Sequence, residues 1–106
     1  MINALYVMVF SLFGIQNQEY CKLQGAVYIE ESAKFANYIV YEDDSEAFAD
    51  KLIYEEINKL FADKPGKWFF VESKGLAEFT VYFTEDRGKA HFTVYFTESD
   101  TFAGCQ

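Results

Sequence analysis

FTVYFTEDRGKAHFTVYFTESD, residues 79–100, contains the heptapeptide FTVYFTE twice, and the second copy starts thirteen residues after the first. In each copy bulky apolar residues alternate with threonine and tyrosine, so that Phe79, Val81 and Phe83 fall on one face of an extended chain. A period of two is typical of a β-strand with one buried face. The stretch therefore predicts two similar strands that are joined by a short acidic turn.

The same unit recurs along the chain and is marked by a series of alanines. Successive members are 13, 13, 15, 13 and 13 residues apart, and they are Ala36, Ala49, Ala62, Ala77, Ala90 and Ala103. A large apolar residue precedes each alanine except the fifth, and a polar residue usually follows. The longer step coincides with Pro65-Gly66, which supplies a turn with two extra residues and places Trp68 in the slot of Val81.

The short period limits the kind of connection. Thirteen residues cannot hold a strand and also a full helical crossover, which alone takes about a dozen residues. The recurrent alanine has two explanations: another backbone segment passes close to it, or it ends a short helical turn such as SEAFA (residues 45–49). We predict a mainly β fold, a compact ring or coil of six to seven strand-plus-loop repeats with short helical turns in the connections.

The composition favours one compact domain. A chain of 106 residues has room for one small core, and its 51% apolar and 20% aromatic content excludes a disordered protein. The formal net charge is −8, with acidic residues spread along most of the chain and no basic stripe. Nucleic acids and anionic membranes are therefore not expected as partners, because no basic stripe would displace the counterions of their phosphates.

The first twenty residues differ in character from the rest. An apolar run from Ala4 to Phe13 has the length of a secretory h-region and is too short to span a bilayer as a helix. It predicts a signal peptide over residues 1–20, a mature chain with no stable membrane insertion, and a secreted or periplasmic location. No Lys or Arg precedes Lys22 and no clean cleavage site is present, which leaves open an N-terminal strand or helix packed on the core.

The two cysteines, Cys21 and Cys105, stand at the two ends of the remaining domain, residues 21–106. An even number of cysteines in a small exported domain indicates a disulfide. Two alternatives stay open: free buried thiols in a cytosolic protein, or half of a metal site. One histidine and no CxxC motif leave few soft ligands for a metal.

The repeat resembles a known family. The recurring units FADK and LAEFTVY, the centre EAFADKLIYEEINKLFADKPGKWFFVES (residues 46–73) and the closing TFAGC are similar to the 7(1) septoil knot domain, a small bacterial repeat family. The resemblance covers residues 21–105 and implies a deeply knotted chain, wound as a torus knot with seven crossings. Composition and spacing alone do not indicate a knot, since knots are rare among protein folds.

The resemblance also bears on export and activity. Some family members look exported and carry a Cys before the first unit and a closing Gly-Cys, which Cys21 and Gly104-Cys105 match. The chain departs from the family at Lys89, where an apolar residue is usual, and in its leader. The family supplies no catalytic residue that could be transferred to this chain.

A search for catalytic chemistry gives little. His91, the only histidine, stands in the polar slot after an alanine, where an exposed or turn-capping role is expected. The sequence has no nucleophile with a poised base and no phosphate-binding glycine loop, so it predicts no enzyme, no cofactor and no metal. The acidic turns at residues 42–44 and 55–56 lack the spacing that wraps Ca²⁺, which favours solvated turns.

One tyrosine recurs at the same slot in five of the units. The row consists of Tyr28, Tyr41, Tyr54, Tyr82 and Tyr95. Facing outward, it could stack on a glycan or a second protein; alternatively, tyrosine simply suits a half-exposed strand face. We predict an exported, highly stable, non-catalytic structural or binding module whose partner is an unknown protein or glycan, with a homodimer left open. The alternative is an interaction or accessory subunit of a larger secreted or surface assembly.

Overall fold

The computed structural model describes residues 20–106, which form seven short strands separated by single turns of 3-10 helix. The strands are β1 Gly25–Ile29, β2 Tyr38–Glu42, β3 Lys51–Glu55, β4 Lys67–Val71, β5 Phe79–Phe83, β6 Phe92–Phe96 and β7 Gly104–Cys105. The turns are η1 Tyr20–Lys22, η2 Ala33–Phe35, η3 Glu46–Phe48, η4 Lys59–Phe61, η5 Lys74–Leu76, η6 Arg87–Lys89 and η7 Asp100–Phe102. The mainly β prediction is therefore confirmed, whereas the predicted signal peptide lies outside the described residues except for Tyr20.

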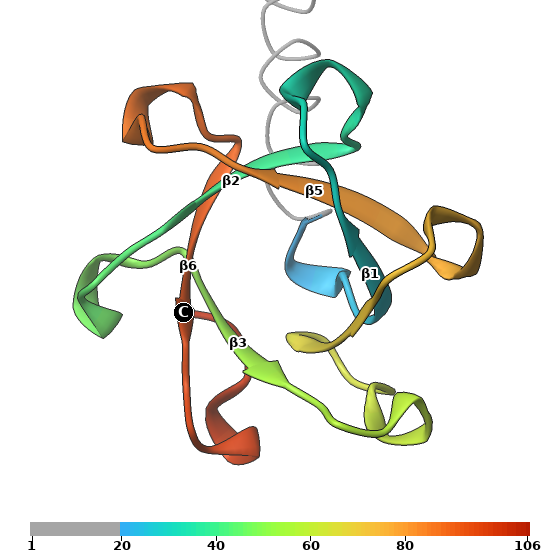
Figure 1. Cartoon of the computed structure of the whole chain (residues 1–106). Helices are drawn as coiled ribbons and strands as arrows, with labels where there is room; N and C mark the ends of the chain where they lie inside the picture. The colour runs from blue at the N-terminus through green and yellow to red at the C-terminus, as the bar shows by residue number, and fades with distance from the viewer. Residues whose placement is uncertain (1–19) are drawn as a thin grey trace, which may run out of the picture.

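Strands β1 to β6 close into a ring of parallel strands (Figure 1). Their order is β4-β1-β5-β2-β6-β3, and β3 pairs back to β4. Apart from β3 and β4, strands that follow one another in sequence are not neighbours, because a strand from another part of the chain lies between them. The chain therefore winds around the ring axis more than once, and later strands fill the gaps between earlier ones.

Each connection passes over the strand that it skips. The β1–β2 connection carries η2, which contacts β5, the strand between β1 and β2. In the same way η5 contacts β1, η6 contacts β2 and η7 contacts β3. The turns η2 to η7 project outward around the ring in Figure 1. The exception is the connection from β3 to β4, which are paired directly and have no strand between them.

Reciprocal hydrogen bonds fasten each crossing connection to the strand beneath it. The Asn37 backbone N–H donates to Thr80 Oγ1 at 2.9 Å, and the Thr80 N–H donates to Asn37 Oδ1 at 2.8 Å. Asp50 and Thr93 repeat this arrangement, with both distances at 2.9 Å. These residues occupy the polar slot after the alanine, so that slot binds one layer of the winding to another.

Glu78 and His91 also follow an alanine, but the strand that each one meets offers backbone groups in place of a threonine hydroxyl. The Ala26 N–H donates to Glu78 Oε2 at 2.8 Å, and the Glu78 N–H donates to the Ala26 carbonyl at 2.8 Å. His91 Nδ1 accepts from the Ile39 N–H at 3.0 Å, and the His91 N–H donates back to the Ile39 carbonyl at 2.7 Å. The single histidine thus has a structural hydrogen-bonding role at a crossing.

Both explanations of the recurrent alanine describe part of the geometry. The alanines that close η2 to η7 donate their backbone N–H to the first residue of each turn, as Ala36 does to Ala33 at 3.3 Å. The next residue then meets the crossed strand in four of these connections. Ala49 and Ala62 are buried, although both stand beside an exposed phenylalanine. In those four connections the alanine therefore ends a 3-10 turn and also directly precedes the point where the connection contacts the strand that it crosses.

The core fills the inside of the ring. Its central layer takes one fully buried side chain from each of the six parallel strands: Val27, Val40, Ile53, Trp68, Val81 and Val94. Trp68 occupies the slot that the sequence register assigns to it. The large apolar residues before the alanines lie instead on the outward turns and are 58% to 70% exposed: Phe35, Phe48, Phe61, Leu76 and Phe102.

Candidate functional site at the open end of the barrel

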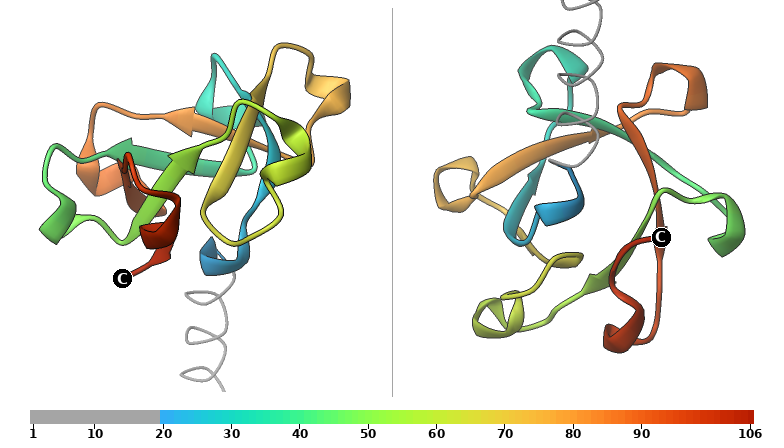
Figure 2. Two further views of the ribbon diagram at one scale, coloured as in Figure 1. Left: turned by 90° about the horizontal axis from the view of Figure 1, so that it is seen from below. Right: turned by 180° about the vertical axis from the view of Figure 1, so that it is seen from behind.

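The two ends of the barrel differ. Both ends of the described chain meet at the end where the parallel strands begin, and Figure 2 shows η1 and the C-terminus on the same side of the ring. Cys21 and Cys105 form a disulfide there, with 5.3 Å between their Cα atoms. Tyr20 stacks on Phe92, with ring centroids 4.5 Å apart and planes within 7°. This end is therefore closed, and the predicted cysteine pair is part of the closure.

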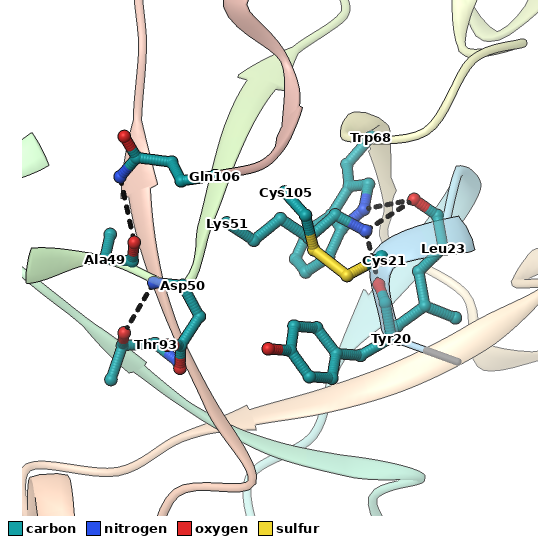
Figure 3. The surroundings of a disulfide bond; sticks show 10 residues. All are labelled: Tyr20, Cys21, Leu23, Ala49, Asp50, Lys51, Trp68, Thr93, Cys105 and Gln106. Atoms are coloured by element: carbon teal, nitrogen blue, oxygen red, sulfur yellow. Dashed lines mark hydrogen bonds between the residues drawn. A yellow bond between two sulfur atoms is a disulfide. The ribbon is translucent and has the colours of Figure 1, made fainter. Parts of the chain in front are cut away.

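A buried lysine lies beside the disulfide, because Lys51 on β3 is paired with Cys105 on β7 (Figure 3). The Lys51 side chain is fully buried, and its Nζ donates to the carbonyl oxygens of Tyr20 at 2.6 Å and Leu23 at 3.0 Å. The ammonium also lies 5.7 Å from the centre of the Trp68 ring, but within residues 20–106 no carboxylate forms an ion pair with it. Burial lowers the pKa of Lys51 from 10.5 to about 7.

The backbone at the closed end is tightly packed around Leu23 and Gly66. The Leu23 carbonyl also accepts from the Gly66 N–H at 3.0 Å and from Trp68 Nε1 at 3.2 Å. Gly66 has φ +87°, and a Cβ atom there would lie 2.3 Å from the backbone nitrogen of Gly104. The closed end is thus a packed structural element, in which the donors and acceptors serve the fold.

The other end, where the parallel strands finish, holds a cavity of about 570 Å³. Each of the six strands contributes one lining residue, and these are Ile29, Glu42, Glu55, Phe70, Phe83 and Phe96. They stand two positions after the central core layer, so they form the next inward-facing layer of the barrel. We call this set the open mouth, and its volume lies in the range of small-molecule sites.

The strand order fixes how apolar and acidic residues alternate around the open mouth. Glu42 on β2 lies between Phe83 and Phe96, and Glu55 on β3 lies between Phe96 and Phe70. The Phe96 ring centre is 6.2 Å from that of Phe70 and 6.2 Å from that of Phe83. Three clustered rings thus form an apolar floor, with a carboxylate on each side of the central ring.

The two mouth carboxylates are solvent-exposed and, unlike Glu30 and Glu56, form no ion pair. Glu30 pairs with Lys74 at 2.7 Å, and Glu56 pairs with Lys67 at 3.6 Å. No ion pair or side-chain hydrogen bond joins Glu42 or Glu55 to another residue in the part of the chain that the structure describes. No basic side chain lines the cavity either, so its charge is not neutralised from within.

The acidic turn that follows β2 is held by protein groups. Asp43 accepts the Ser45 N–H at 2.9 Å and pairs with Arg87 across the winding. The Ser45 hydrogen bond, and next the Arg87 guanidinium, lower the pKa of Asp43. Among residues 20–106 no three His, Cys, Asp or Glu side chains gather in a way that could hold a metal ion. Asp43 is thus a tether between two windings.

The tyrosine row occupies the outer face of the barrel. Each member follows a central core residue by one position and is half-buried: Tyr28, Tyr41, Tyr54, Tyr82 and Tyr95. Because they come from different strands of a closed ring, they are spread around its circumference. Tyr41 is covered in part by Arg87, whose guanidinium carbon lies 5.7 Å from the ring centre. Their role in binding stays a prediction.

The winding of connections over strands is what the resemblance implies, and comparison with known families agrees. The 7(1) septoil knot domain matches residues 20–106. The chain belongs to the 7(1) septoil knot family. No curated protein and no solved structure matches it. Within the septoil knot domain no helix is long and apolar enough to cross a membrane.

Two structural features of this septoil knot domain were missed at the level of sequence, the open mouth and the buried Lys51. The open mouth becomes visible only when the residues two positions after the central layer are read together, which the thirteen-residue register would have allowed. Lys51 occupies the slot that Phe79 and Phe92 fill in other strands, and a charged residue in an aromatic slot was a readable signal. The strand order, which sets Glu42 and Glu55 around Phe96, had no signal in a single unit.

Proposed function

We propose that this septoil knot domain is an exported, non-catalytic binding module that holds its ligand in the open mouth. The observation that carries the proposal is the difference between the two barrel ends. One end is closed by the two ends of the described segment and a disulfide, whereas the other exposes phenylalanines and carboxylates without ion-pair partners around an open cavity of about 570 Å³. A rigid, closed barrel keeps such a site preorganised, which lowers the entropic cost of binding.

The polar groups of the domain support a non-catalytic role. His91 Nδ1 is occupied by the Ile39 N–H, so it lacks the free acceptor that a general base needs. Both cysteines are in the disulfide, so neither serves as a nucleophile. Glu42 and Glu55 stand at the open mouth without a neighbouring nucleophile or base among its lining residues.

Export is supported by the disulfide, because such bonds persist in oxidising compartments. Mass spectrometry of the protein from its natural compartment tests this part. We expect a mature N-terminus close to Cys21 and a mass that is two hydrogens below that of the dithiol. Two titratable thiols would contradict export. The assignment of the fold does not depend on this measurement.

Binding at the open mouth is tested by amide NMR of the oxidised protein. We would titrate it separately with phenol, indole, choline and N-acetylglucosamine. We expect at least one probe to shift the amides at the ends of β2, β5 and β6, and Phe96→Leu to weaken that response. Phe48→Leu on η3 is the matched control, since Phe48 is 70% exposed and is not one of the lining residues. Shifts confined to the turns would refute a binding site in the mouth.

A second candidate is an accessory subunit of a secreted or surface assembly. The apolar residues on the outward turns favour it, because exposed aromatics are common at protein interfaces. A homodimer would use the same surface. Light scattering of the oxidised protein, with and without Phe48→Ser and Phe102→Ser, tests this candidate: a monomer at all concentrations argues against self-association.

A further inference from the structure

The lining of the open mouth indicates which class of ligand it takes. We propose that the mouth binds a small organic ammonium ion, with the apolar part of the ligand on the phenylalanine cluster and the cation between Glu42 and Glu55. This inference rests on the proposed function, because it uses the same cavity. It adds the charge and chemical type of the ligand.

The phenylalanines of the mouth favour a cation that carries apolar groups. Phe70 and Phe83 lie on either side of Phe96, with both centroid distances at 6.2 Å. These three side chains are only half-buried although they lie at the end of the core. An organic ammonium gains from contact with aromatic rings through cation–π attraction as well as through burial of its alkyl groups. Inorganic cations lack the second contribution.

The charge of the lining favours a cationic ligand over anionic and neutral ones. Within the described chain, the exposed side chains of Glu42 and Glu55 form no ion pair, and the formal charge of the whole protein is −8. An anion would be repelled by both carboxylates. A neutral apolar ligand would cover the carboxylates and remove water from them without supplying a partner, which is unfavourable. An ammonium ion supplies that partner, so it alone satisfies both components of the lining.

The size of the mouth favours a free small molecule. The mouth is an open depression of about 570 Å³ that is lined by one residue from each of six strands, in contrast to the long apolar groove that a helix requires. The ring of strands has no free edge at this end for an added strand, because β1 to β6 are all paired on both sides.

The decisive comparison uses choline and its neutral isostere 3,3-dimethylbutan-1-ol, which differ chiefly in the charge. Calorimetry and amide NMR on the unmodified, oxidised protein should show choline binding about tenfold more tightly, which corresponds to the energy of a partly desolvated cation–π and ion-pair contact. Raising the salt concentration should weaken choline binding and leave the isostere unchanged.

Two double variants test whether Glu42 and Glu55 cause the preference for choline over the neutral isostere. The double variant Glu42→Gln and Glu55→Gln should lose most of the preference for choline while it still binds the isostere. Glu46→Gln with Asp63→Asn is the matched control: it removes the same charge at exposed sites outside the lining set, so the preference should persist. Thermal melts show whether each variant is folded.

The possible outcomes separate the inference from the proposed function. Equal binding of choline and the isostere at the mouth would overturn the ammonium inference and leave the mouth as a binding site. If no probe moves the mouth amides, including phenol and indole, both proposals are wrong. Because the first comparison needs only the unmodified protein, poor folding of a variant does not remove the test.

Discussion

The Lys51 ammonium lies 2.6 Å from the Tyr20 carbonyl oxygen, and this contact joins a buried strand residue to the turn that carries Cys21. The charge is enclosed without a carboxylate in the described chain, so the fold tolerates it through two carbonyls and the Trp68 ring. Burial lowers the pKa of Lys51 to about 7, which makes the closed end sensitive to pH.

The first prediction is that the domain becomes more stable as pH rises from 7.5 to 9.5. In the folded chain the pKa of Lys51 falls from 10.5 to about 7, so between these values the unfolded chain binds more protons than the folded chain. The free energy of unfolding should therefore rise by up to about 1.4 kcal/mol per pH unit. Below pH 7 both states are protonated, and this contribution levels off. Urea unfolding at several pH values measures the slope.

Substitution of Lys51 tests whether this residue causes the pH dependence of the free energy of unfolding. Lys51→Met should flatten the pH dependence over this range, whereas Lys22→Met, at an exposed position, should retain it. The window stops short of pH 10, because burial and then the nearby Asp50 raise the pKa of Tyr20. The raised pKa of Tyr20 has the opposite effect on stability to the lowered pKa of Lys51. Above pH 10 the folded chain retains the phenol proton that the unfolded chain loses, so the free energy of unfolding falls as pH rises. An equal slope in Lys51→Met would exclude Lys51 as its source.

The second prediction concerns the reciprocal hydrogen bonds at the crossings. Asp50→Ala removes the acceptor of the Thr93 N–H and should cost about 1 to 2 kcal/mol of stability. Asp63→Ala is the matched control. Asp63 stands in the slot of Asp50, but in the connection between β3 and β4, which are paired directly with no strand to cross. Asp63→Ala should change stability by less than about 0.5 kcal/mol. Chemical denaturation of both variants gives the comparison, and equal losses would contradict a role for the crossing.

The fold could be predicted to a large extent from the repeat, because each unit carries its own strand pattern and connection length. Trp68 lies in the buried slot that the register assigns, despite the two-residue insertion at Pro65-Gly66. The order of strands could not be predicted in this way. Near-identical units give no local signal of which unit pairs with which, so the winding came from the family resemblance.

The candidate site was less predictable for the same reason. Glu42 and Glu55 each look like an ordinary acidic residue at the end of a strand. They flank Phe96 only because β6 lies between β2 and β3 in the ring. In contrast, the disulfide depends only on the two chain ends meeting, and the position of the cysteines made that prediction accessible.

The third prediction uses two glycines as a matched pair. Gly66→Ala should be strongly destabilising, by more than about 3 kcal/mol, because it combines an unfavourable positive φ with a backbone clash. Gly75→Ala on η5 should change stability by less than about 1 kcal/mol, since no atom beyond its chain neighbours lies within 4 Å of the new Cβ. Thermal unfolding of both variants measures the difference. A mild effect at Gly66 would mean that the C-terminal segment is not packed against it in solution.

The last prediction concerns the disulfide in a wound chain. Cys21 and Cys105 are 84 positions apart, and chain-entropy models assign roughly 4 to 5 kcal/mol to a loop of this size, an upper figure for measured effects. The joined ends also cannot withdraw through the winding when the packing melts. The oxidised protein should therefore refold rapidly after denaturant is diluted, whereas reduced protein should refold more slowly the longer it has been held unfolded. Stopped-flow fluorescence of Trp68 after variable unfolding times measures both rates.

The double variant Cys21→Ser and Cys105→Ser should behave like the reduced protein, which separates loss of the bond from effects of the reductant. A refolding rate independent of the unfolding time in the reduced protein would show that threading does not limit folding.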